Sequence, residues 1–473
     1  MSTWPAINVV ADDVCSGKTT ALSNVQKSLT CIKEKKEYNA VISVIEERAK
    51  KRASDIDKKL QQGEKVGRLA GVPFIAKDNF LTFGTETTAA SNMLSGFNAP
   101  YQATAIEKLE QEGAICVAKA NLDAFAHGSS TENSDYFTTK NPVYKTRVPG
   151  GSSGGSAAAV VLGMAPFALG TDTGGSIRLP ASFCGCVGYK PTYGLVSRHG
   201  VIAMASSTDV VGPLTSSVED TALIVDVLAG KDKLDSTMIE RDRSYHDLKG
   251  SSVKKVGVIT EYFKDVANVN VKKSINSVID TLKKAGYSVE DVSIASSDAS
   301  LGCYYILCPA EIASNLARYD GLKYGHTATG TDSLEESYEK SRSEGFGLEA
   351  KRRIMVGTYV LSSGYYDAYY RQAQLVRTKI INDFKNAFTK YDILLGPTAP
   401  VTAFKIGQKD KHDPMSMYLM DVMTVSANLA GIPAISIPAP IKDSLPVGLQ
   451  LLARQGNDKQ LLKFSKQVQD LLA

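Results

Sequence analysis

The most informative stretch of the chain, residues 150–178, reads GGSSGGSAAAVVLGMAPFALGTDTGGSIR. Two clusters rich in glycine and serine, at 150–156 and 170–176, enclose a short apolar segment. That segment predicts a helix from about 156 to 162 and a strand at 167–169. Flexible linkers do not enclose a buried helix in this way, so we interpret both clusters as turns that let the backbone approach another group closely.

Strands and helices alternate along most of the chain outside this stretch. Residues 1 to about 65 are polar and are predicted to be helical, and residues 217–220 have the spacing of a capping box before a helix. This alternation favours an α/β fold whose strands are covered by helices on both faces. The further predicted strands lie at 71–76, 114–118, 253–259, 288–292 and 393–395, and the further predicted helices at 103–112, 221–228, 271–285, 365–390 and 459–472.

The composition is that of an ordinary globular protein. The chain has 473 residues, enough for about three domains of typical size, and 43% of them are apolar and 22% charged. The formal net charge of +4 gives no electrostatic reason to expect a dedicated nucleic-acid binder. Seven cysteines without paired metal-ligand spacing predict reduced thiols and no metal site. With no evident signal peptide and no apolar run long enough to span a membrane, we expect a cytoplasmic protein.

Two short motifs match known catalytic loops but lack the context that those loops need. Residues 17–19, Gly-Lys-Thr, match the end of a phosphate-binding loop, yet Asp12 stands where its first glycine belongs. Residues 150–154 satisfy the pattern G-x-S-x-G of a nucleophile elbow, but a polar segment ending in Pro149 precedes them instead of a buried strand. None of the five histidines has the setting of a catalytic base, which argues against a Ser-His-Asp hydrolase.

The second glycine cluster has the features of an acyl-transfer site. Its consecutive N–H groups at residues 173–176 can converge on one oxyanion, and Ser176 can serve as a nucleophile. A nucleophilic serine needs a base, and Lys77 follows an apolar strand that would bury its stem. Burial lowers the pKa of a lysine and makes the neutral amine available. The residues are equally compatible with a Lys77 that ends its strand at the surface.

These residues resemble the signature of the amidase signature family. The signature has two parts, GGSSGGS at 150–156 and GTDTGGSIR at 170–178, and the motif GVPFIAKDN at 71–79 matches the segment that carries the family's lysine. The resemblance implies a central mixed sheet covered on both faces by helices. It also implies one domain over residues 1–473, divided into a helical extension at 1–65, a signature core at 66–215 and a remainder at 216–473 that completes the substrate pocket.

The resemblance also assigns roles to the residues of the two clusters. Ser176 would be the nucleophile, Lys77 the general base, and Ser152 the serine that bridges them, held by a cis peptide bond after Gly151. An ion pair between Asp172 and Arg178 would brace the loop. The N–H groups of the oxyanion hole would come from Thr173, Gly174, Gly175 and Ser176.

Within the family, the chain is most similar to the glutamine-hydrolysing subunits of tRNA-dependent amidotransferases. This similarity implies that Arg353 binds the α-carboxylate of glutamine and Asp421 its α-ammonium, with Arg352 as an alternative for the first role. His127 departs from the pattern, since a small or apolar residue, usually methionine, is expected there. The other implied substrate residues are Tyr304 (or Tyr305), Gly128 and Ser129. The motifs that carry the similarity lie at 124–132, 304–311, 314–321, 351–355, 362–370 and 417–421.

The similarity further implies a reaction shared between subunits. This chain would hydrolyse glutamine without a cofactor or metal ion of its own. The ammonia would pass to a tRNA-binding B subunit, where ATP and Mg²⁺ serve the conversion of glutamate on tRNA(Gln) to glutamine. A small C subunit would complete a heterotrimer, and misacylated tRNA would be bound mainly by the partner.

Two other functions are compatible with parts of the same sequence. A stand-alone amidase acting on a small carboxamide would use the same serines and lysine, but it would not need Arg353 and Asp421 as a clamp for an amino acid. A non-catalytic scaffold or tRNA-binding protein would need none of these residues. The joint presence of Lys77, Ser152 and Ser176 argues against such a scaffold.

Overall fold

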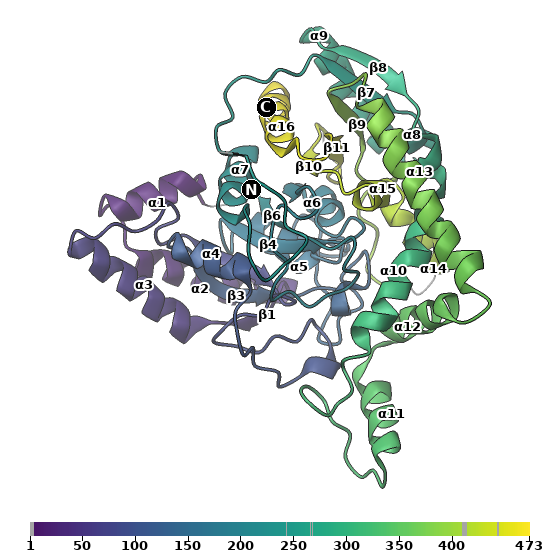
Figure 1. The fold of residues 1–473 in the computed structure, drawn as a ribbon. Helices are drawn as coiled ribbons and strands as arrows, with labels where there is room; N and C mark the ends of the chain where they lie inside the picture. Colours follow the sequence, from purple (N-terminus) through teal and green to yellow (C-terminus); the bar gives the residue numbers. More distant parts are fainter. Residues whose placement is uncertain (1–3, 243, 265, 267, 409–413, 442–443) are drawn as a thin grey trace.

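One mixed β-sheet runs through the molecule and organises the rest of the fold (Figure 1). The computed structural model describes residues 4–242, 244–264, 266, 268–408, 414–441 and 444–473. Within these ranges the sheet has eleven strands in the order β1-β3-β2-β4-β6-β5-β10-β11-β9-β7-β8. The strands are β1 (Val41–Val44), β2 (Pro73–Lys77), β3 (Ile115–Ala120), β4 (Phe167–Asp172), β5 (Val187–Lys190), β6 (Val210–Thr215), β7 (Lys255–Ile259), β8 (Ser288–Val292), β9 (Ile393–Pro397), β10 (Ala434–Pro438) and β11 (Gly448–Leu452).

Parallel strands lie toward both ends of the sheet, and antiparallel strands lie between them. Strand β2 is parallel to both of its neighbours, β3 and β4, and β7 is parallel to β8 and β9. The strands from β4 through β6, β5, β10 and β11 to β9 pair antiparallel. The predicted mixed α/β sheet is therefore confirmed.

Helices cover both faces of the sheet, as the buried strand sequences predict. In β2, Ile75 packs in one core cluster with α2, α3 and α5, whereas Phe74 and Ala76 pack in another with α4 and α7. In β9, Leu394 faces α10 and α13, whereas its neighbours face α9 and α16. The longer helices are α1 (Ile7–Cys15), α2 (Ala21–Glu34), α3 (Glu46–Gln61), α4 (Thr104–Gln111), α5 (Gly154–Val161), α7 (Val218–Leu228), α9 (Val269–Lys284), α10 (Ser300–Leu316), α11 (Leu334–Gly345), α12 (Leu348–Leu361), α13 (Gln372–Ala387) and α16 (Asp458–Leu472).

Local sequence signals determine several of these element ends. The N-cap half of the predicted capping box is present, since the Ser217 hydroxyl accepts a 3.1 Å hydrogen bond from the N–H of Asp220 at the start of α7, whereas the Asp220 carboxylate accepts from the N–H of Ile7. Small residues fill α5, which is buried along almost its whole length against β4 and β2. The predicted strands at 71–76, 114–118, 253–259, 288–292 and 393–395 correspond to β2, β3, β7, β8 and β9.

The first 65 residues are not helical throughout, and this corrects the prediction. Residues 41–44 form β1, which pairs antiparallel with β3 at the edge of the sheet (Figure 1, purple). The strand has only four residues and stands next to a segment rich in lysine, glutamate and alanine. The helical pattern of that segment, α3, therefore led to a helix prediction that included the strand. Likewise, the helix predicted at 365–390 begins with a π-helical segment, Tyr366–Arg371, before α13.

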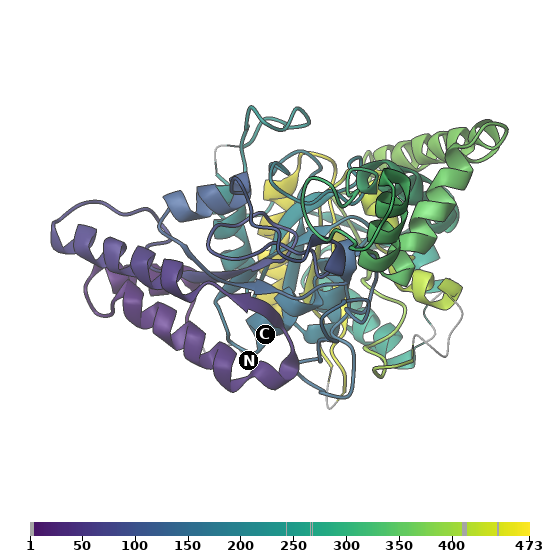
Figure 2. The same cartoon turned by 90° about the horizontal axis from the view of Figure 1, so that it is seen from below.

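The helices α10, α12 and α13 stand together at one side of the sheet, shown in green in both views (Figure 1, Figure 2), and α11 extends away from them in Figure 1. The closest packing among them joins α10 to α12, and α13 also packs on α10. Tyr304 lies on α10 and Arg353 on α12. No helix in the described part of the chain is both long and apolar enough to cross a membrane.

Candidate active site

The site begins where parallel strands end. Strand β2 ends at Lys77, and the parallel strand β4 runs beside it in the register Ala76 to Leu169. Carboxyl ends of parallel strands meet at one edge of a sheet, so Lys77 and Thr171 project into the same space. The Nζ atom of Lys77 lies 2.9 Å from Oγ1 of Thr171, which also accepts a 3.1 Å hydrogen bond from Asn79.

Lys77 is fully buried and contacts the predicted bridging serine. Its Nζ lies 2.7 Å from the hydroxyl oxygen of Ser152 and 3.5 Å from the carbonyl oxygen of Thr171. A neutral amine has two N–H donors and one lone pair. The two oxygens of Thr171 can take both donors, which leaves the lone pair for the proton of Ser152. The surface position that the sequence left open for Lys77 is therefore wrong.

The electrostatic setting of Lys77 favours the neutral amine that this hydrogen-bond pattern needs. Burial lowers the pKa of Lys77 to about 7, although the nearby carboxylates of Asp123, Asp172 and Asp209 act in the opposite direction. Both protonation states are then populated near neutral pH. An amine with such a pKa can accept and return a proton within one reaction cycle.

The two serines lie on adjoining loops. The peptide bond between Gly151 and Ser152 is cis, as predicted, and the N–H of Ser153 donates a 3.1 Å hydrogen bond to the carbonyl oxygen of Ser176. This bond joins the N-terminal end of α5 to the loop after β4. Within the described residues, no hydrogen bond links the two hydroxyls of Ser152 and Ser176. Catalytic hydrogen bonds are often longer before substrate binds.

The loop from Thr173 to Ser176 presents backbone donors to the site. In the described part of the chain, the N–H groups of Gly174, Gly175 and Ser176 donate no hydrogen bond, so they are available to an oxyanion. Gly175 has φ +147°, and a Cβ there would overlap the Thr424 hydroxyl. A Cβ at Gly174 would lie 2.8 Å from the Tyr304 ring. Glycine is thus required for the loop to pack beneath these side chains.

A buried ion pair anchors the loop from below. Arg178 donates through Nη2 to Asp172 at 2.9 Å and through Nε at 3.0 Å. Its remaining donors reach the Thr424 carbonyl at 3.1 Å, the Asn428 side chain at 2.6 Å and the Gln450 side chain at 2.6 Å. Burial alone would raise the pKa of Asp172, but the charge and hydrogen bonds of Arg178 lower it to about 2. The predicted brace is present and extends to the C-terminal part of the chain.

Asp421 is a buried carboxylate close to the same loop. It lies in a 3₁₀ turn, Leu419–Asp421, and accepts a 2.9 Å hydrogen bond from the Ser129 hydroxyl. Its Oδ1 would lie 3.4 Å from a Cβ on Gly175. Burial raises the pKa of Asp421 to about 7, while the Ser129 hydrogen bond and the positive charge of Arg353 act to lower it.

Arg353 supplies the matching positive charge. Its side chain is buried, and Nε donates a 2.9 Å hydrogen bond to Glu349 one turn earlier on α12. The guanidinium carbon lies 5.4 Å from the Tyr305 ring and 5.8 Å from the Tyr418 ring, and those two rings stack on each other. Arg352, by contrast, is half exposed and pairs with Glu349. Of the two candidate arginines, Arg353 is therefore the one buried near Asp421. Of the two candidate tyrosines, Tyr304 is the one that contacts the glycine loop, at Gly174.

Several residues that support the site were not found from the sequence. Thr171 contacts the amine of Lys77, Asn79 donates a hydrogen bond to Thr171, and Asp209 accepts a 2.7 Å hydrogen bond from Thr173. Asp123 accepts hydrogen bonds from the backbone of Thr131 and Asn133 and packs against Gly151. Only Asn79 had a sequence signal, as a polar residue two positions after the end of β2.

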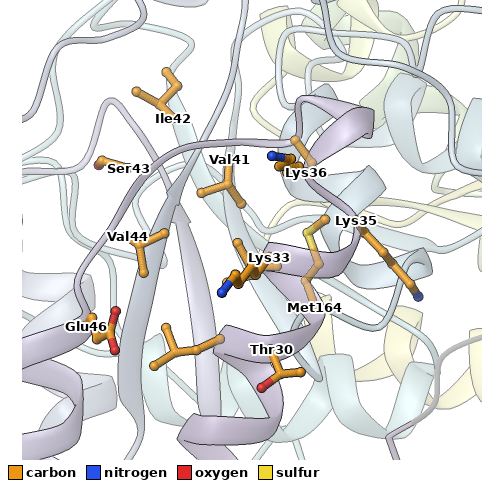
Figure 3. A pocket seen from close by; sticks show the side chains of 13 residues that line it. Thr30, Lys33, Lys35, Lys36, Val41, Ile42, Ser43, Val44, Glu46 and Met164 are labelled. Carbon is orange, nitrogen blue, oxygen red and sulfur yellow. The ribbon is translucent and has the colours of Figure 1, made fainter.

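A separate cavity lies away from this site. It has a volume of about 530 Å³ and lies between α2 and the edge strand β1, with Lys33 and Lys36 beside it (Figure 3). The strand is short and has an irregular register between Val41 and Ser43. Short strands, irregular pairing and nearby lysines protect open sheet edges, so we assign this cavity no ligand. Among the described residues, no group of three or more histidine, cysteine or acidic side chains could hold a metal ion.

Comparison with known proteins identifies relatives along almost the whole chain. The family model named Amidase matches residues 23–462. The A subunit of glutamyl-tRNA(Gln) amidotransferase from Alkaliphilus metalliredigens is 53% identical, with 90% of this chain and 87% of that protein covered. The protein of the same name from Thermoanaerobacter pseudethanolicus is 50% identical, with 95% and 92% covered.

Solved structures give the same relationship. The crystal structure of the A subunit of glutamyl-tRNA(Gln) amidotransferase from Thermotoga maritima is 40% identical, with a TM-score of 0.78 over 94% of this chain and 90% of that one. A bacterial aryl acylamidase of the amidase signature enzymes is 23% identical, with a TM-score of 0.87 over 99% and 96%. The second likeness concerns the fold alone.

Proposed function

Since the chain belongs to the amidase family, we propose that it is the glutamine-hydrolysing A subunit of a glutamyl-tRNA(Gln) amidotransferase. Support comes from relatives of that name that are 50% or more identical over at least 90% of the chain. The observation that carries the chemistry is the 2.7 Å contact between the buried amine of Lys77 and the hydroxyl of Ser152, next to the loop that holds Ser176.

The proposed reaction starts with a proton relay. Neutral Lys77 accepts the proton of Ser152, and Ser152 accepts that of Ser176 while Oγ of Ser176 attacks the side-chain carbonyl carbon of glutamine. The N–H groups of Gly174 and Gly175, with that of Ser176, stabilise the negative oxygen that forms. Thr173 completes the loop and is held by Asp209. A pKa of about 7 for Lys77 supports this role.

The same relay then works in reverse. As the tetrahedral intermediate collapses, the carbon–nitrogen bond breaks and Lys77 returns the proton through Ser152 to the leaving nitrogen. Ammonia departs and an acyl-enzyme ester remains on Ser176. Water, deprotonated by the same pair, attacks the ester, and glutamate leaves with Ser176 restored.

Substrate selection follows from two opposite charges beside the loop. Arg353 binds the α-carboxylate of glutamine and Asp421 its α-ammonium, because a guanidinium fork suits a carboxylate and a buried carboxylate suits an ammonium. Ser129 orients Asp421 through its hydrogen bond, and Gly128 directly precedes Ser129 in the chain. Tyr304 lines the pocket over Gly174. Both charged groups are buried, which strengthens their interaction with a zwitterion.

The remaining steps belong to partners. We propose that a B subunit binds the misacylated tRNA and uses ATP and Mg²⁺ to accept the ammonia, and that a small C subunit completes the heterotrimer. This chain itself needs no cofactor for the steps above. We further propose that residues 1–473 form one domain, because all eleven described strands join one sheet. The complex would work in the cytoplasm, where aminoacyl-tRNA is used.

Ammonia release from glutamine by the reconstituted complex tests this function. Ser176→Ala should abolish release, because the other hydroxyl within the loop from Thr173 to Ser176, that of Thr173, is engaged by Asp209. Ser156→Ala is a matched control, since Ser156 is also a buried serine, lies on α5, and within the described residues its hydroxyl bonds only the Leu169 carbonyl. Full activity in Ser176→Ala would contradict the mechanism. Rapid hydrolysis of simple amides with glutamine ignored would instead identify a stand-alone amidase.

A further inference from the structure

One histidine in the site has no explained role. His127 is fully buried, and neither Nδ1 nor Nε2 has a hydrogen-bond partner among the described residues. A buried polar group without a partner costs about 1–3 kcal/mol, so such groups usually have a partner in the functional state. The partner that this imidazole lacks would then be supplied by something that enters the site.

The backbone holds His127 in a fixed position at the site. It follows Phe125 and Ala126, whose φ values of 51° and 64° lie in the left-handed region that non-glycine residues seldom adopt. The carbonyl of His127 accepts a 2.9 Å hydrogen bond from Asn133, and its N–H bonds the Ala124 carbonyl at 3.0 Å. Strained backbone of this kind clusters at ligand sites.

The surroundings of His127 are those of the proposed glutamine pocket. The Phe125 ring lies 6.2 Å from the imidazole, and Ser129, two residues on, is bonded to Asp421. Burial and the positive charge of Arg353 lower the pKa of His127 well below its ordinary value. The imidazole is therefore neutral, with one N–H donor and one acceptor nitrogen.

We propose that His127 donates its ring N–H to the α-carboxylate of bound glutamine, next to Arg353. This inference rests on the proposed function and adds a substrate-binding residue to it. A carboxylate offers about four acceptor positions, and a guanidinium fork occupies two of them. The α-ammonium has its own partner in Asp421, so the carboxylate is the part of the substrate that needs a further donor near Arg353.

His127→Met and His127→Gln in the reconstituted complex test the assignment. Methionine keeps the volume without a donor and should raise the KM for glutamine about tenfold or more, the size expected for a hydrogen bond to a charged group, with kcat changed much less. Glutamine at this position retains an N–H donor and should recover part of the lost affinity. An unchanged KM in His127→Met would overturn the proposal.

Two truncated substrates identify the group that His127 contacts. 4-Aminobutanamide lacks the α-carboxylate, so wild type and His127→Met should hydrolyse it with equal kcat/KM. Glutaramate retains the carboxylate and lacks the ammonium, so the penalty of His127→Met should persist. An equal penalty on all three amides would mean that His127 only packs the site, and the proposal would be refuted.

Phe125→Leu is the matched control on the same segment. It removes packing without touching a hydrogen bond and should affect the three amides alike. Thermal unfolding without substrate gives a second readout: removing an unpartnered imidazole should not destabilise the protein, whereas loss of a structural contact would. Absent Ser176-dependent glutamine hydrolysis in wild type would refute the proposed function and this inference together, whereas normal hydrolysis with an unaffected His127→Met would refute this inference alone.

Discussion

The Ser129 hydroxyl donates a 2.9 Å hydrogen bond to the Asp421 carboxylate across 292 positions of the chain. The bond joins the segment after β3 to the turn before α15 (Val425–Leu429), and both partners are buried. Asp421 also approaches Gly175 in the loop after β4. The substrate side of the site is therefore assembled from three distant parts of the sequence, each with a separate contribution to test.

The pH dependence of turnover should follow Lys77. Because burial places its pKa at about 7, kcat should rise as the pH increases through 7 and the amine loses its proton. Steady-state ammonia release over a pH range that spans this pKa measures this rising limb of the kcat–pH profile. Lys190→Met is a matched control, since Lys190 is also buried with a pKa lowered to about 7, but among the described residues its amine donates only to the Pro191 carbonyl. A limb that disappears in Lys190→Met would contradict the assignment.

Glutamine binding should depend on the ionisation of Asp421. Its pKa is raised to about 7, so the KM for glutamine should fall as the pH rises through 7 and the carboxylate becomes charged. The Ser129 hydrogen bond favours the ionised form, so Ser129→Ala should move this limb of the KM profile to higher pH. Asp421→Asn should raise KM and remove the limb. A pH-independent KM in the wild type would argue against Asp421 as the ammonium ligand.

Protonated Lys77 should destabilise the folded protein. Its folded pKa lies below the ordinary value of 10.5, so the unfolded chain binds more protons between pH 7 and 10.5 and stability rises with pH in that window. Lys77→Met should therefore be more stable than wild type at pH 7, by up to a few kcal/mol, and flatter in its pH dependence. Urea unfolding at the two ends of this window measures both. Equal slopes in the two proteins would contradict the burial argument.

Arg178→Met should be strongly destabilising. It leaves the buried Asp172 charge without its partner, and breaking a buried ion pair in this way costs about 3–5 kcal/mol. In wild type the folded pKa of Asp172 is about 2, below the ordinary value of 3.8, so its contribution is present above about pH 4 and is lost as the pH falls through 2.

The double variant Arg178→Met with Asp172→Asn is the control for this prediction. It removes both charges, so it should recover part of the stability that the single variant loses. Urea unfolding at neutral pH provides the comparison. If the single and double variants were equally unstable, packing rather than the uncompensated charge would explain the loss.

The residue patterns predicted which residues take part in catalysis better than they predicted the long-range contacts that bring those residues together. The two glycine clusters and Lys77 identified the strand ends and loops that meet at the site, because these residues perform local tasks that leave local signals. The register of β2 with β4 and the bond from Ser129 to Asp421 depend on long-range pairing, which no local pattern contains.

The supporting residues show the same limit. Thr171 and Asp209 look like any polar residue near a strand, and only their contacts with Lys77 and Thr173 reveal their roles. Strand β1 was missed because four residues next to a charged helix carry too little periodicity. His127 stood out as a departure from the family pattern, but its missing hydrogen-bond partners could be recognised only in three dimensions.

The contacts of Arg178 imply that the catalytic loop is fully supported only late in the synthesis of the chain. Thr424, Asn428 and Gln450, the ligands of Arg178, follow it by 246, 250 and 272 positions, so they are synthesised well after Ser152 and Ser176. Until they arrive, the loop that carries Ser176 lacks most of its support. A nascent or C-terminally truncated chain that ends before Gln450 should therefore release no ammonia, so hydrolysis begins only once synthesis has passed Gln450. Stalled chains of graded length would show this as an abrupt onset of activity.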